Sequence, residues 1–225
     1  MSLLLYAVVR FHKPKRMLEI GSGYTSVFML QALRDNDIEL DAFQKRHREA
    51  PSSFPKHTWV VPSEVNGYHH GRLTCVDNLG HKSTTAAALV AVAEELGLGD
   101  HLEFEEGDAF EHARVLEEEG EVLDLLWVDF GDGDRLDEFF ELYWNLVKPS
   151  GGLILVHSTC TNSSSKSWLA ALKCKSRDKS SSGMGLFDVL SLLEPHKMRQ
   201  NSVTMIQRRG FDVEPYDEPC YTKYA

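Results

Sequence analysis

The sequence predicts an α/β protein built on a mostly parallel sheet with helices on both faces. Short apolar segments with strand character alternate along the chain with segments of helical periodicity. A glycine-rich turn follows the first of these strands, and acidic residues follow the next ones. The 225 residues are enough for one well-buried core, so we expect a single domain over residues 1–225.

The predicted strands are apolar runs that end at glycine or at a polar residue, which is typical of strands buried in a parallel sheet. The first five are Arg16–Ile20, Leu73–Asp77, Leu102–Glu106, Val122–Asp129 and Leu153–His157. Two segments near the end of the sequence, Phe187–Leu193 and Ser202–Arg208, have the character of final strands.

Helices are expected between these strands, because apolar residues recur there at helical spacing. The apolar segment Met1–Val9 predicts a short amphipathic helix packed on the sheet. The other predicted helices are Thr25–Leu33, a helix that Ser83 or Thr84 caps and that ends at Leu96, Leu136–Val147, and a short one around Trp168–Leu172.

One segment breaks this alternation. Asp35–Arg72 is long and polar and contains three prolines and two glycines, whereas ordinary connections are far shorter. We therefore expect an insertion at about residues 35–72 that acts as a lid over the acceptor site. Its Trp59 and Tyr68 would supply apolar walls.

The bulk composition argues against several classes of protein. A net charge of −10 argues against a broad nucleic-acid-binding surface. No apolar run is long enough to span a membrane, and the first residues lack the features of a signal peptide. The four cysteines form no CxxC pair, which favours reduced thiols and a cytoplasmic location. Both a monomer and a homodimer are compatible with the sequence.

The segment Glu19–Ser26 follows the first strand and has glycine at positions 21 and 23. Glycine lets the backbone turn tightly and approach a ligand closely, although a tight turn alone is a structural alternative. Ser26 replaces the third glycine of the dinucleotide fingerprint, and the charge of Glu19 would repel a pyrophosphate. These two features favour a nucleoside joined to a cationic amino acid over the dinucleotide of a nicotinamide oxidoreductase.

Two acids follow the next two strands. Asp77 is placed to accept hydrogen bonds from both hydroxyls of a ribose, and Asp108 from an adenine amino group, with Phe110 near the ring. Each acid could instead cap the helix that follows it. Since parallel strands end at one edge of the sheet, we expect both acids to lie near the glycine-rich turn.

Several of these motifs, taken together, resemble class I S-adenosylmethionine-dependent methyltransferases, and most closely the catechol O-methyltransferase-like small-molecule group. They are Leu18–Gly23, Val76-Asp77, Leu96–Phe104 with Gly107-Asp108-Ala109, and Asp124–Asp129. The resemblance covers the chain from Lys15 to Val156 apart from the insertion. It implies a Rossmann-like, seven-stranded, mostly parallel sheet whose last strand is antiparallel, and S-adenosylmethionine as the cofactor.

The residues and the resemblance together predict a set of cofactor-binding residues, among which Asp129 would lie beside the reacting methyl group. The set is Glu19, Gly21, Ser22, Gly23, Tyr24, Ser26, Asp77, Asn78, Asp108, Ala109, Phe110 and Asp129. The predicted reaction is O-methylation of a small molecule. N-methylation of a small amine and non-catalytic binding of the cofactor are the alternatives.

The catalytic prediction depends on where the sequence departs from the family. Metal-dependent members end the fifth strand in an Asp-Asn pair, whereas this chain has His157-Ser158, so we expect no magnesium requirement. Asp129 with His157 could hold a softer ion such as Zn²⁺ or Fe²⁺, but two ligands are too few to assign a metal. His157 is the first candidate for the general base and Asp132 the second, with Asp129 beside them. A strand-end histidine bonded to the backbone is the structural alternative for His157. His69 and His70 are interpreted as an exposed pair in a loop.

Overall fold

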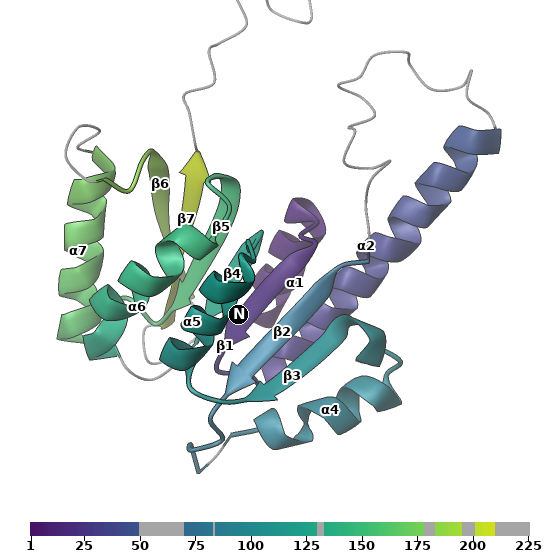
Figure 1. Ribbon diagram of the computed structural model, residues 1–225, viewed down its shortest axis with the longest axis horizontal. Coiled ribbons are helices and arrows are strands. Elements are labelled where there is room, and N and C mark those ends of the chain that lie inside the picture. The colour runs from purple at the N-terminus through teal and green to yellow at the C-terminus, as the bar shows by residue number, and fades with distance from the viewer. Residues whose placement is uncertain (50–69, 83, 130–132, 178–182, 195–200, 210–225) are drawn as a thin grey trace, which may run out of the picture.

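The computed structural model describes residues 1–49, 70–82, 84–129, 133–177, 183–194 and 201–209 (Figure 1). A seven-stranded sheet with the order β3-β2-β1-β4-β5-β7-β6 forms its centre. The first five strands are parallel, and β7 is antiparallel to both of its neighbours. The strands are β1 (Arg16–Ile20), β2 (Arg72–Asp77), β3 (Leu102–Glu106), β4 (Leu125–Val128), β5 (Ser150–His157), β6 (Phe187–Glu194) and β7 (Asn201–Arg209).

This strand order confirms the predicted Rossmann-like sheet and its antiparallel last strand. The helices are α1 (Ser2–His12), α2 (Tyr24–Glu49), α4 (Ala86–Glu95), α5 (Ala109–Glu119), α6 (Leu136–Tyr143) and α7 (Ser163–Arg177). Short 3₁₀ turns are η2 (Gly99–His101), η3 (Gly133–Arg135) and η4 (Trp144–Leu146).

The helix that follows β1 is much longer than the prediction of Thr25–Leu33. In the structure α2 continues to Glu49, so the first part of the predicted insertion is helical. Its low mean hydropathy hid this continuation, although no proline or glycine interrupts it before Pro51. Arg10 of α1 holds the extension by donating hydrogen bonds to Asn36 and Glu39 at 2.6 and 2.9 Å. Residues 50–69 of the insertion, including Trp59 and Tyr68, lie outside the described residues.

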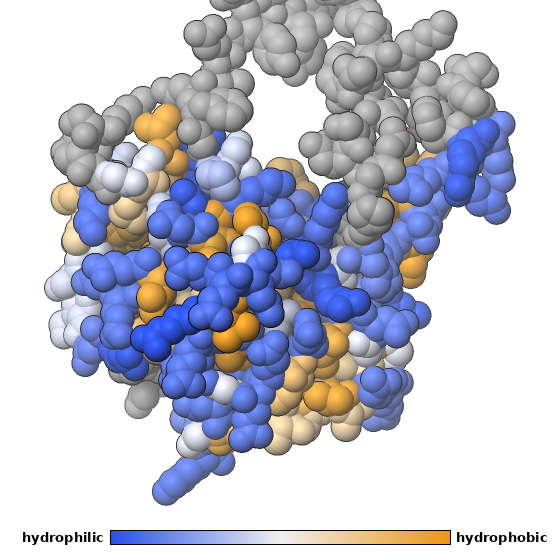
Figure 2. Space-filling view, viewed as in Figure 1, coloured by the Kyte–Doolittle hydropathy of each residue, from blue (hydrophilic) through white to orange (hydrophobic). Residues whose placement is uncertain are grey.

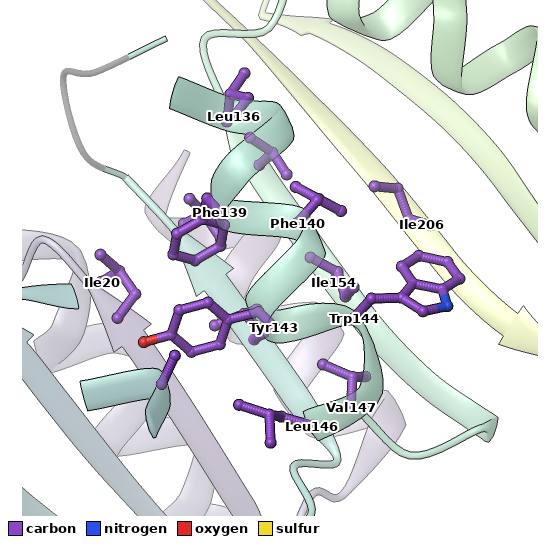
Figure 3. Close-up of a cluster of buried hydrophobic side chains, with 14 of the residues drawn as sticks. Ile20, Leu136, Phe139, Phe140, Tyr143, Trp144, Leu146, Val147, Ile154 and Ile206 are labelled. Atoms are coloured by element: carbon purple, nitrogen blue, oxygen red, sulfur yellow. The ribbon is translucent and has the colours of Figure 1, made fainter. Parts of the chain in front are cut away.

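Two hydrophobic clusters hold the layers together, one on each face of the sheet. On one face, α1, α2 and α4 pack against residues such as Trp127 and Leu155, which confirms that the first helix lies on the sheet. On the other face, α5, α6 and α7 cover residues such as Leu126 and Ile154. Figure 3 shows how the aromatic residues of α6 lie over the strands of this second face. Because both faces are covered, ligands can reach the parallel strands only at their ends.

Figure 2 shows a mainly hydrophilic face with a small hydrophobic area over α4 near the bottom of the view. Among the described residues, no helix combines the length and apolarity that a membrane crossing requires.

Candidate functional site

A cavity of about 710 Å³ opens at the carboxyl ends of β1, β2 and β3. Its volume lies within the range of small-molecule sites. The cavity adjoins the point where the strand order reverses between β1 and β4, which is where open α/β sheets bind ligands. The residues that line it are Ile20, Gly21, Ser22, Gly23, Tyr24, Thr25, Val76, Asp77, Asn78, His81, Thr84, Thr85, Gly107, Asp108, Ala109, Phe110, Asp129 and Arg135.

The turn after β1 forms one wall and needs both of its glycines. Gly21 has a φ of 82°, in the left-handed region, and its N–H donates to the carbonyl of Val76 at 3.0 Å. At Gly23 a Cβ atom would lie only 2.6 Å from Thr85 Oγ1. Between them, the Ser22 hydroxyl is buried without a hydrogen-bond partner in the described part of the chain. The wall therefore offers a ligand a polar group that the protein itself leaves unsatisfied.

Asp77 joins this turn to the loop that follows β2. Its Oδ2 accepts from the Ser22 N–H at 2.9 Å, and its Oδ1 accepts from the Leu79 N–H at 2.7 Å. Leu79 has a φ of 55°, an uncommon conformation for leucine that this bond supports. The carboxylate is therefore fixed in position, and each oxygen keeps a further lone pair for a ligand donor.

Asp108 caps α5, as the structural alternative predicted. Its Oδ1 accepts from the N–H groups of Phe110 and Glu111 at 2.8 and 3.2 Å. Those two bonds leave Oδ2 unused, and Asp108 also lines the cavity. The ring of Phe110 lies beneath Arg135, whose guanidinium carbon is 3.6 Å from the ring centroid. Capping and ligand contact are thus compatible at this position.

Glu19 and Ser26 do not line the cavity, although the sequence predicted them among the cofactor contacts. Both are fully buried behind the turn. Glu19 accepts hydrogen bonds from Cys75 Sγ at 3.1 Å and from Thr25 Oγ1 at 3.4 Å. Burial, with a smaller contribution from the charge of Asp129, raises the pKa of Glu19 to about 8, although hydrogen bonds from Ser26, Cys75 and Thr25 act in the opposite direction. At neutral pH the Glu19 carboxyl is therefore mostly protonated.

At the end of β4, Asp129 meets the histidine that ends β5. The Nδ1 of His157 lies 2.6 Å from Oδ1 of Asp129, so the ring is bonded to a carboxylate and not to the backbone. Asp129 lines the cavity, whereas His157 lies behind it against Trp127, with ring centroids 5.7 Å apart. Its Nε2 is buried and has no hydrogen-bond partner among the residues described. Asp132, the second candidate base, falls outside those residues.

Sequence reasoning missed several residues of the cavity wall. His81, Thr84 and Thr85 belong to the loop between β2 and α4, where Thr84 was interpreted only as a helix cap. The rule that loops after parallel strands bind ligands would have included the whole loop. Arg135 lies six residues after Asp129 in an acidic stretch, and no pattern in the sequence distinguishes it.

Residues 18–159 match the sequence profile of a family described as a methyltransferase domain. No curated protein sequence matches the chain. The resemblance in sequence therefore rests on the family profile.

Solved structures extend the comparison to the fold. An O-methyltransferase from Streptomyces achromogenes, involved in tomaymycin synthesis and solved with SAM, is 17% identical with a TM-score of 0.62, over 93% of this chain and 79% of its own. An O-methyltransferase from Bacillus cereus solved with SAH is 14% identical with a TM-score of 0.62, over 92% and 80%. A methyltransferase from Podospora anserina bound to SAH is 18% identical with a TM-score of 0.57, over 92% and 77%. At these identities the likeness is one of fold.

The buried Glu19 makes a pH-dependent contribution to stability. Since its pKa rises from an ordinary 4.5 to about 8 on folding, the folded state keeps a proton that the unfolded chain has lost between these values. The free energy of unfolding should therefore fall as pH rises from about 4.5 to 8, by up to about 1.4 kcal/mol per pH unit. Glu19→Gln should remove this part of the slope in urea unfolding at pH 5.5, 7 and 8.5. A slope unchanged in Glu19→Gln and equal to that of the exposed-site control Glu95→Gln would contradict the assignment.

Proposed function

This chain belongs to a family of methyltransferase domains, and we propose that it transfers a methyl group from S-adenosylmethionine to a hydroxyl group of a small molecule, without magnesium. The observation that carries the proposal is a single cavity lined by the turn at Gly21–Gly23, by Asp77 and by Asp108. These three groups suit the amino acid, the ribose and the adenine of one adenosyl compound.

The residues of the cavity fit such a cofactor. The Ser22 hydroxyl is an unsatisfied polar group for the amino-acid end, and the fixed Asp77 carboxylate can accept from two neighbouring hydroxyls. At Gly107 nothing lies within 4 Å of the position of a Cβ atom, so a flat base can approach the backbone there. Oδ2 of Asp108 and the ring of Phe110 would recognise adenine. Solved relatives that contain SAM or SAH support this assignment.

When bound, S-adenosylmethionine supplies an electrophilic methyl group on a sulfonium sulfur. The chain must then orient the acceptor oxygen and accept its proton. Asp129 faces the cavity and His157 is hydrogen-bonded to it at 2.6 Å. Because Asp129 and not His157 lines the cavity, we assign the proton of the acceptor hydroxyl first to the Asp129 carboxylate, which passes it to Nδ1 of His157.

The same pair supports a hydroxyl acceptor and a reaction without magnesium. An amine acceptor needs no strong base, whereas a hydroxyl does, so the Asp129–His157 pair favours O-methylation. Magnesium prefers a shell of oxygen ligands, and an imidazole stands beside Asp129 where an oxygen ligand would be required.

A panel of small phenols, alcohols and amines tests the acceptor class. Incubation with S-adenosylmethionine should yield S-adenosylhomocysteine with at least one hydroxyl compound, and EDTA should leave the rate unchanged. Mass spectrometry of both products measures the transfer. Turnover of amines alone would favour N-methylation, a loss of rate with EDTA would refute metal independence, and no turnover with any acceptor would favour a binding protein.

Asp77 should determine the affinity for the cofactor. Removing the charged acceptor of two ribose hydroxyls in Asp77→Ala should weaken binding of S-adenosylhomocysteine about 10–100-fold. Isothermal titration calorimetry measures this change, and circular dichroism checks that the variant is folded. The exposed Asp100→Ala is the matched control and should bind like the wild type. Equal affinity in both variants would remove Asp77 from the site.

His157 should contribute to turnover and not to cofactor affinity. Loss of a general base in His157→Ala should lower kcat about 100- to 10,000-fold while the Kd for S-adenosylhomocysteine stays the same. His12→Ala is the control, because His12 contacts the Asp124 carbonyl at the opposite edge of the sheet, at 3.1 Å. If turnover survived in His157→Ala, or if only the Kd changed, the histidine would not be the base.

A further inference from the structure

A second group of reactive side chains lies at the edge of the sheet opposite the cavity. Asp37 comes from the middle of α2, His70 lies two residues before the start of β2, and His101 ends η2 just before β3. One ligand atom from each side chain lies within 4.8 Å of the other two. His70 Nδ1 contacts Asp37 Oδ2, and His101 Nε2 is 3.9 Å from that same oxygen. We refer to these three residues as the Asp37 cluster.

His101 is held in the orientation that a metal-binding histidine needs. Its ring is buried, and Nδ1 lies 2.9 Å from the carbonyl oxygen of Gly71. A carbonyl can only accept, so Nδ1 carries the hydrogen and Nε2 keeps its lone pair. Nε2 is the ring nitrogen that lies near the Asp37 carboxylate, 3.9 Å from Oδ2. Metal-ligating histidines are commonly fixed by such a bond from the other ring nitrogen to a backbone carbonyl.

Asp37 supplies a negative charge whose ion-pair partners among the described residues are the two histidines. Both of its carboxylate oxygens are buried, and within the described residues neither accepts a hydrogen bond. The contact with His70 brings a nitrogen against one of them, and the His70 ring stacks on that of His101 with centroids 4.3 Å apart. Burying a carboxylate that accepts no hydrogen bond lowers the stability of the folded protein unless a cation balances its charge.

We propose that the Asp37 cluster binds a zinc ion. Zinc prefers imidazole nitrogen and carboxylate oxygen in a tetrahedral shell, and three protein ligands leave the fourth position for water. Magnesium would prefer oxygen ligands throughout. The sequence predicted no metal at these residues, and the proposal gives His70, interpreted from the sequence as a loop residue, a function.

The proposed zinc site does not depend on the proposed methyl transfer. Asp37 lies about 20 Å along α2 from Tyr24 in the cavity wall, at 1.5 Å per residue. Its three ligands belong to segments far apart in sequence, so the ion would fasten α2 to the starts of β2 and β3.

Zinc binding can be measured on the full-length, tag-free protein after dialysis against a chelator. Isothermal titration with zinc chloride should show one site per chain, and magnesium chloride should show none. At a zinc concentration 100 times the Kd, the Tm should rise by about 5–10 °C. His70→Gln removes a half-exposed ligand with little effect on packing, and Asp37→Asn keeps the shape of the carboxylate. Each should weaken zinc binding about 100-fold or more.

The exposed Asp41→Asn is the matched control, because Asp41 lies one turn after Asp37 on α2. It should bind zinc and respond in Tm like the wild type. Stoichiometric zinc in the wild type and Asp41→Asn, lost in His70→Gln and Asp37→Asn, supports the proposal. The absence of a saturable site in the wild type, or equal binding in all four proteins, overturns it, and neither result bears on the cofactor cavity.

Discussion

The cavity depends on two hydrogen bonds that fasten the turn after β1 to the end of β2. Gly21 donates to the Val76 carbonyl at 3.0 Å and Ser22 donates to the Asp77 carboxylate at 2.9 Å. They bring the glycine-rich backbone beside the next strand, so that the space between β1, β2 and β3 stays open for a ligand. Asp77 therefore has two functions, since the carboxylate proposed to bind the ribose also shapes the wall beside it.

Much of the fold could be predicted because burial in a parallel sheet leaves a strong pattern. The strands are short apolar runs, and their ends carry the glycines and acids of the site. The extension of α2 could not be predicted from periodicity, because only a few of its residues, such as Leu40, are buried. Bonds from Arg10, far away in the sequence, stabilise it.

The candidate site, too, could be predicted from the sequence only in part. Asp77, Asp108 and Asp129 follow strands and were predicted to lie near each other, and all three line the cavity. Side-chain direction is a different matter, since Glu19, the fourth residue of β1, is buried behind the turn and does not line the cavity. The Asp37 cluster has no sequence signature at all, because its members are separated by whole secondary-structure elements.

Helix α2 links the two sites, because it contributes residues both to the cavity and to the Asp37 cluster. Tyr24 and Thr25 in its first turn line the cavity, while Asp37 lies further along the same helix, which Figure 1 shows as one continuous element. One residue added between Thr25 and Asp37 would rotate the carboxylate by about 100° relative to the cavity. Homologous chains that keep both sites should therefore keep the number of residues between these two positions unchanged.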